Sequence, residues 1–199
     1  MKDWMKIKAL TAGELLKEFE LSDEDAVQCL VPGTAPRVSI ENLTNAGHYL
    51  DAVKLLAHAL PKREAVWWAC LASRKVQTPD TDQPNVDALI AAEAWAKQPT
   101  EDNRLRARLL GKKTGHKTPA SWAATAAAWS TGSLAEPGEP EIATPEYMYA
   151  HAVAGSVALA AVLSEPDDPT ESYRLFLRQG FNLACGGNGI LTAEELQYG

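Results

Sequence analysis

The sequence lacks the residue groupings that mark common metal and redox sites. It holds three cysteines, Cys29, Cys70 and Cys185, an odd number spread along the chain. No two of them have the spacing of a zinc ligand pair or a redox dithiol. The four histidines form neither an HxxxH nor an HExxH pattern. We therefore expect no metal and no cofactor, and the unpaired cysteines fit a reducing compartment.

Positive charge and long apolar runs are also scarce. Lys and Arg number 19 against 26 Asp and Glu, which gives a formal net charge of -7. Nucleic-acid-binding proteins usually carry clustered cations, so we expect no nucleic-acid partner. The most apolar stretch, residues 150–163, is shorter than the ~20 residues that span a bilayer. Residues 1–21 contain no apolar run of signal-peptide length. The sequence thus predicts a cytoplasmic protein without a membrane partner.

Motifs for nucleophilic catalysis and phosphate binding are missing as well. Ser121 and Ser130 lack a GxSxG setting. Gly186, Gly187 and Gly189 follow an expected helix instead of leading one from a strand, so they indicate helix termination. We therefore predict a protein that is not an enzyme.

The sequence is rich in signals for helices. Alanine is its commonest residue, and alternating runs of Val, Ile and Thr are nearly absent. Thr118-Pro119, Thr144-Pro145 and Asp168-Pro169 are cap-plus-proline pairs that open helices. The fold class predicted is all-α, a single bundle of about eight or nine short-looped antiparallel helices, with an α-solenoid-like stack as a variant. Helices are expected over residues 42–60, 61–75, 85–98, 100–113, 119–132, 145–163 and 169–184.

The first 36 residues form a candidate N-terminal helical appendage, and residues 37–199 form the main helical domain. Thr11 and Glu14 have the spacing of a capping box. Ser22 precedes an acidic first turn, which the helix dipole favours. Pro and Gly residues between positions 31 and 36 indicate a loop that separates the two parts.

The most unusual segment is the corner at Pro61, where one expected helix ends and the next begins. Lys62 and Arg63 occupy the first helical turn, where the dipole disfavours each positive charge by ~0.3–1 kcal/mol. Glu93 lies on the apolar face of its own expected helix and needs a counter-charge there. We predict a structural ion pair between Arg63 and Glu93, or alternatively between Arg74 and Glu93.

Partner binding is the leading functional prediction for this corner. Trp67 and Trp68 point in different directions from one helix, and we expect Trp68 to be the exposed one. Tryptophan is enriched at binding hot spots. The predicted partner face contains Lys62, Arg63, Trp68 and the long loop from Gly132 to Pro145.

Three features leave alternatives open. An enzyme of unrecognised type would use an acidic and histidine pocket of His58, Glu64 and Glu93. A structural or regulatory oligomer would bury apolar patches across a two-fold axis. The basic residues that follow position 103 could attract an acidic partner, although a solvated helix face is the simpler interpretation; they are Arg104, Arg106, Arg108, Lys112, Lys113 and Lys117.

Several blocks resemble an uncharacterised bacterial family of helical proteins. The most specific is LAHALPKREAVWWACLASR (residues 56–74), which contains the LPKREAVWWAC signature. Softer blocks are AAEAWAKQPTEDNR (91–104), TPASWAATAAAWSTGSLA (118–135) and HAVAGSVALAAV (151–162). The resemblance covers residues 51–187 and implies no established activity. It associates the chain with type VI secretion gene neighbourhoods, which implies an accessory, adaptor or chaperone-like role with a secretion effector or spike component as partner.

Overall fold

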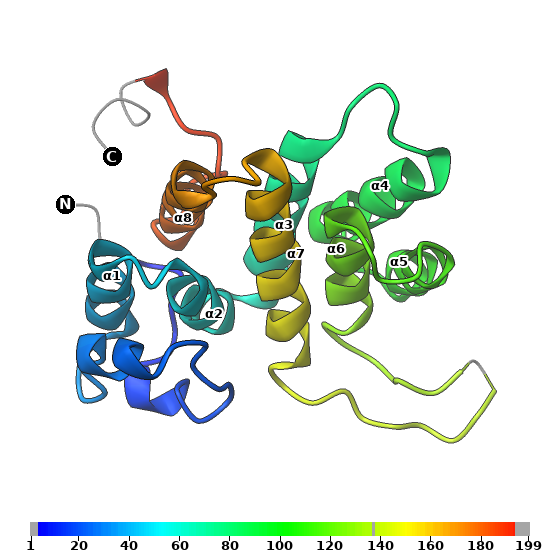
Figure 1. The fold of residues 1–199 in the computed structure, drawn as a ribbon. Helices are drawn as coiled ribbons and strands as arrows, with labels where there is room; N and C mark the ends of the chain where they lie inside the picture. Colours follow the sequence, from blue (N-terminus) through cyan, green and yellow to red (C-terminus); the bar gives the residue numbers. More distant parts are fainter. Residues whose placement is uncertain (1–3, 137, 194–199) are drawn as a thin grey trace.

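A computed structural model describes residues 4–136 and 138–193, and Figure 1 shows its helices. Within these residues the regular elements are helical, apart from one isolated antiparallel bridge between Ser133 and Ala143. The predicted all-α class is therefore confirmed. The α-helices are α1 (Pro36–Ala46), α2 (Tyr49–Ala59), α3 (Lys62–Val76), α4 (Gln83–Lys97), α5 (Glu101–Lys113), α6 (Pro119–Ala128), α7 (Met148–Ser164) and α8 (Thr170–Ala184).

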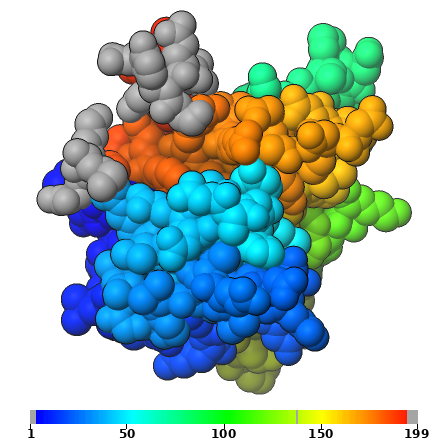
Figure 2. All heavy atoms as spheres, turned by 60° about the vertical axis from the view of Figure 1, so that its left-hand side comes forward, coloured from blue at the N-terminus to red at the C-terminus, as the bar shows by residue number. Residues whose placement is uncertain are grey.

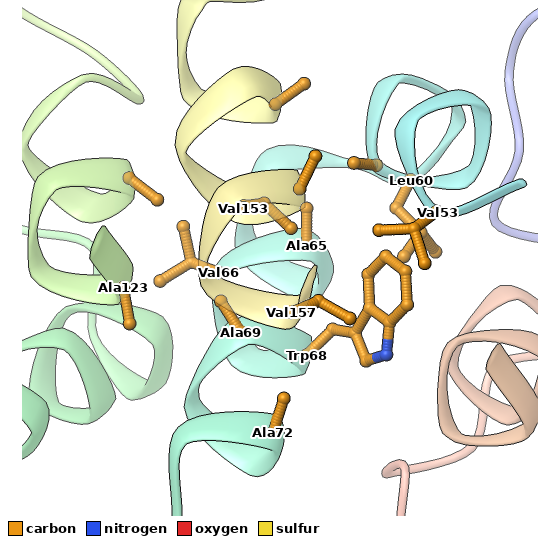
Figure 3. Close-up of a cluster of buried hydrophobic side chains, with 14 of the residues drawn as sticks. Val53, Leu60, Ala65, Val66, Trp68, Ala69, Ala72, Ala123, Val153 and Val157 are labelled. Atoms are coloured by element: carbon orange, nitrogen blue, oxygen red, sulfur yellow. The ribbon is translucent and has the colours of Figure 1, made fainter. Parts of the chain in front are cut away.

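Helices α3 and α7 lie side by side at the centre of the bundle. Helix α3 packs against α4, α6, α7 and α8, and α7 also contacts α2 and α6. Figure 3 shows the two sides of α3: Val66 points toward Ala123 of α6, whereas Trp68 points toward Val53 and Leu60. All five side chains are buried. Helix α3 is thus covered on both sides, and only its ends and edges reach solvent.

Helix α6 is short and buried on nearly every side. All of its residues except Trp122 are buried, and most are alanine. Such small side chains let neighbouring helices approach closely, as Gly111 of α5 does against Ala124. The buried hydroxyl of Ser156 donates to the Pro119 carbonyl (2.8 Å) and also contacts the Ser73 hydroxyl (3.1 Å). These bonds satisfy polar groups in an otherwise apolar contact.

The N-terminal segment packs against the helical bundle. Residues 4–35 contain two short 3-10 helices, Ala12–Glu14 and Glu24–Cys29, in place of the α-helices expected there. The Lys6 amide donates to Ala184 (3.0 Å), the Ser22 amide donates to Asp51 (2.7 Å), and the Trp4 ring contacts Phe181. In Figure 2 this segment and α1 and α2, blue to cyan, form one continuous face beside α8 in orange.

One predicted helix is divided in two. The helix expected over residues 42–60 is α1 and α2, and α1 begins at Pro36, inside the segment expected to be a loop. Gly47 ends α1 with a φ of 85°, the left-handed conformation that suits glycine. Pro36 therefore does not end a loop outside the helix, as predicted, but occupies the first helical position.

No helix in the described part of the chain is long and apolar enough to cross a membrane.

Candidate functional site

A hollow of about 290 Å³ lies beside the first turn of α3, at the corner singled out in the sequence. We call it the α3 hollow. Ala96 of α4 and Leu183 of α8 are its buried apolar residues. Trp67 lines it too, and its indole nitrogen donates to the Asn188 carbonyl (2.9 Å). The segment after α8 therefore closes one side of the hollow. Its other lining residues are Lys6, Arg63, Glu64, Lys97, Gly186 and Gly187.

The charges around the α3 hollow are unevenly paired. Lys6 forms an ion pair with Glu64, Nζ to Oε1 3.2 Å. Arg63 and Lys97 are both exposed, and within residues 4–136 and 138–193 neither has a carboxylate partner. The amino-terminal end of α3 adds partial positive charge at the same place. The hollow is therefore suited to hold a negatively charged group.

Trp68 does not form part of this site. Its side chain has no exposed surface, and its indole nitrogen donates to the Phe176 carbonyl of α8 (2.7 Å). The prediction that Trp68 is an exposed partner contact is therefore wrong, because the direction that it takes from α3 faces α2 and α8. Trp67, its half-buried neighbour, is the one that borders the hollow.

Lys62 also points elsewhere. Its ammonium group lies over the ring of Tyr149 on α7, 5.7 Å from the ring centroid. This cation–π contact stabilises the positive charge of Lys62, for which the sequence had suggested no partner. Of the three residues predicted to bind a partner, Arg63 alone lines the α3 hollow.

Glu93 pairs with Arg74 instead of Arg63. The distance from Arg74 Nη2 to Glu93 Oε1 is 2.5 Å, and the guanidinium Nε donates to the same oxygen at 3.1 Å. The predicted pair between Arg63 and Glu93 is thus replaced by the alternative. Arg74 is three turns further along α3 than Arg63, on the side that faces α4.

The three groups considered for an enzymatic pocket have separate partners. Glu64 pairs with Lys6, Glu93 pairs with Arg74, and His58 is buried among the rings of Phe19, Tyr147 and His151. Burial lowers the pKa of His58 to about 4. Its Nδ1 contacts the Lys54 carbonyl at 2.8 Å. No group of three or more His, Cys, Asp or Glu side chains in the described residues could hold a metal ion.

The basic residues after position 103 divide into two sets. Arg104, Arg108 and Lys112 lie one turn apart on α5 and contact the loop that follows α6, described over residues 129–136 and 138–147. Arg106, Lys113 and Lys117 are exposed. Sequence spacing alone predicted one face, but it did not reveal that the long loop lies against it.

The fold and the α3 hollow define a helical bundle with a small cationic hollow at one helix start. Residues 39–184 match the model of a family described as "Family of unknown function (DUF6931)". The match covers most of the chain, which therefore belongs to that family. No curated protein matches the chain, and no solved structure does.

Proposed function

We propose that this chain is a non-enzymatic interaction module that binds an acidic segment of a partner protein in the α3 hollow. One observation carries the proposal: Arg63 and Lys97 are exposed, lack carboxylate partners in the described part of the chain, and border the same hollow. These cations lie beside the apolar surface of Ala96 and Leu183. Such a surface suits a segment that carries carboxylates next to an aliphatic or aromatic side chain.

The size of the hollow is compatible with this kind of ligand. Sites for small molecules and cofactors usually enclose ~300–1,000 Å³, and the α3 hollow, at about 290 Å³, lies at the lower end of that range. Such a space is large enough for side chains of a docked peptide segment. Trp67 supplies the aromatic contact that is common in protein interfaces.

The net charge of the whole protein does not oppose the proposal. Its formal net charge of -7 repels an acidic partner at long range. At physiological ionic strength the screening length is only about 8 Å, so nearby charges dominate. Arg63 and Lys97 then decide where an acidic segment binds.

The family resemblance extends the proposal to a bacterial type VI secretion accessory, with an adaptor or chaperone-like role. On that proposal the acidic segment belongs to a secretion effector or a spike component. A bacterial two-hybrid assay against the effectors and spike proteins encoded beside this gene tests the extension. We expect a partner whose signal is lost in Arg63→Glu/Lys97→Glu, and no such partner among them would contradict it.

Binding in vitro tests the core of the proposal. The probe is a fluorescein-labelled peptide of alternating glutamate and leucine, with a glutamine-for-glutamate peptide as its uncharged counterpart. We expect the Arg63→Glu/Lys97→Glu variant to bind the acidic peptide about tenfold more weakly by fluorescence anisotropy, since each exposed pair contributes up to about 1 kcal/mol.

The matched control is Arg106→Glu/Lys113→Glu. It makes the same change in net charge with two exposed cations of α5 that do not line the α3 hollow. It should bind the acidic peptide as the parent protein does. Equal losses in both double variants would mean that general charge, and not the hollow, holds the peptide.

A further inference from the structure

A second hollow, of about 440 Å³, lies between α5, α6 and the described residues of the loop that joins α6 to α7, 129–136 and 138–147. We call it the α5 hollow. Figure 1 shows the loop running out from the end of α6, passing below α5 and returning to α7. This volume falls within the range of about 300–1,000 Å³ that is typical of small-molecule sites.

The loop is held in place by side chains of α5. Arg104, whose side chain is only 3% exposed, donates to the carbonyls of Ala128 (3.1 Å) and Ser133 (3.3 Å). One turn later, Arg108 donates to the carbonyls of Leu134 (2.6 Å) and Ala135 (2.5 Å). These contacts fix the wall of the hollow through backbone atoms.

Gly132 allows the loop to approach α5 this closely. Its φ is 72°, and a Cβ atom added there would lie 2.8 Å from Arg104 Nε. The conformation favours glycine, and a Cβ atom there would force the Arg104 guanidinium to shift. The loop that forms one wall of the α5 hollow is thus held in one position by Gly132 and by the arginines of α5.

Two cations that line the α5 hollow bind a carboxylate of the protein itself. Glu136, from the loop, accepts from Lys112, and its Oε1 lies 3.2 Å from Arg108 Nη2. The Glu136 side chain is 51% exposed. Exposed ion pairs contribute little to stability, so another carboxylate can replace this one at low cost.

The α5 hollow also has an apolar part of its lining. Trp129, Leu134, Ile142 and Met148 line it, and Ile142 is 56% exposed although it is a large aliphatic side chain. Aromatic and thioether side chains adapt well to flat or flexible apolar ligands. The α5 hollow thus combines the cations of Arg108 and Lys112 and the carboxylates of Glu136 and Glu139 with apolar side chains.

We propose that the α5 hollow binds a small carboxylate with an apolar body, such as a medium-chain fatty acid or an aryl carboxylate. The ligand carboxylate takes the place of the Glu136 carboxylate on Arg108 and Lys112. Its apolar part lies against Trp129 and Ile142. This site is separate from the α3 hollow, so the two proposals stand or fall independently.

Isothermal titration calorimetry with decanoate tests this site, with decanol as the uncharged counterpart. We expect decanoate to bind at least tenfold more tightly than decanol, because charge-assisted hydrogen bonds to Arg108 and Lys112 are lost with the alcohol. Equal affinity for the two probes, or no binding of decanoate, would overturn the proposal.

Substitutions locate the binding. Glu136→Gln removes the internal carboxylate and should tighten decanoate binding about threefold, whereas Lys112→Met should weaken it about fivefold. Glu141→Gln and Lys113→Met are matched controls, since these exposed residues do not line the hollow and should leave the affinity unchanged. Weaker binding by Glu136→Gln, or equal losses in Lys112→Met and Lys113→Met, would contradict the assignment.

A third substitution tests the apolar part of the lining without changing charge. Ile142→Ser should weaken decanoate binding severalfold and leave the helical circular dichroism unchanged, because Ile142 is exposed in the loop. Unchanged affinity in Ile142→Ser would place the alkyl chain elsewhere and overturn the proposal.

Discussion

Two adjacent tryptophans on α3 have different surroundings. Trp68 is enclosed by α2 and α8, and Gly180 of α8 makes room for it: a Cβ atom there would lie 3.1 Å from the Trp68 ring and 2.6 Å from Leu56. Trp67 borders the α3 hollow and remains partly exposed. The sequence identified the pair, but the prediction that Trp68 is the exposed one was wrong, because the choice depends on where α8 packs.

Substituting the two tryptophans separately tests this assignment. Trp68→Ala should lower the free energy of unfolding by about 3–5 kcal/mol, because it leaves a cavity in the core. Trp67→Ala should lower it by about 1 kcal/mol, since its ring loses fewer buried contacts. Urea unfolding followed by circular dichroism measures both. A Trp67→Ala variant that is the less stable of the two would contradict the structure.

The buried imidazole of His58 makes stability depend on pH. Burial lowers its pKa in the folded protein to about 4, against 6.5 for an unperturbed histidine. Between these values the unfolded chain binds a proton that the folded protein excludes. Stability is therefore retained above about pH 6.5 and is lost as the pH falls toward 4.

We expect this histidine to cost the parent protein about 3 kcal/mol of stability at pH 4 relative to pH 7. A His58→Gln variant should lose that much less over the same range, as measured by urea unfolding at each pH. His116→Asn is the control: His116 is exposed and has a φ of 56°, which asparagine tolerates. If His58→Gln kept the parental pH dependence, burial of a neutral His58 would be wrong.

Capping residues and prolines in the sequence predicted most of the helices. They did not predict every helix end, or which segments pack against each helix. Thr118 caps α6 with a capping box, as its cap-plus-proline pair indicates. The start of α1 at Pro36 was missed, since proline is compatible with both a loop and a first helical turn. The contact between α5 and the loop that follows α6 was also missed, because arginine bonds to distant carbonyls leave no local pattern.

The glycine at the loop anchor can be tested against a second glycine of similar conformation. Gly132→Ala should lower the free energy of unfolding, measured by urea unfolding, more than Gly115→Ala does. Both have positive φ, 72° and 68°, but a Cβ atom at Gly115 meets nothing within 4 Å. We expect about 1 kcal/mol for Gly115→Ala from conformation alone and about 2–3 kcal/mol for Gly132→Ala. Equal losses would mean that Arg104 does not crowd the loop.

At the scale of the whole molecule, an acidic chain presents a local positive site. Two lining residues of the α3 hollow, Lys6 and Lys97, were not predicted as site residues. Lys6 forms an ion pair with Glu64 there. Lys6 and Lys97 come from the N-terminal segment and the end of α4, and only the packing of both against α3 and α8 brings them to Arg63. The sequence therefore located the corner of the site but not its composition.

On the proposed function, an acidic segment binds in the α3 hollow beside Trp67. The most direct test is a two-dimensional NMR titration that observes the indole N–H signals of the six tryptophans with the glutamate–leucine peptide. Trp67→Phe assigns its signal. We predict that the Trp67 indole signal shifts in a saturable manner while the signal of buried Trp68 stays in place. A Trp67 signal that does not move at saturating peptide would mean that the acidic segment does not bind in the α3 hollow.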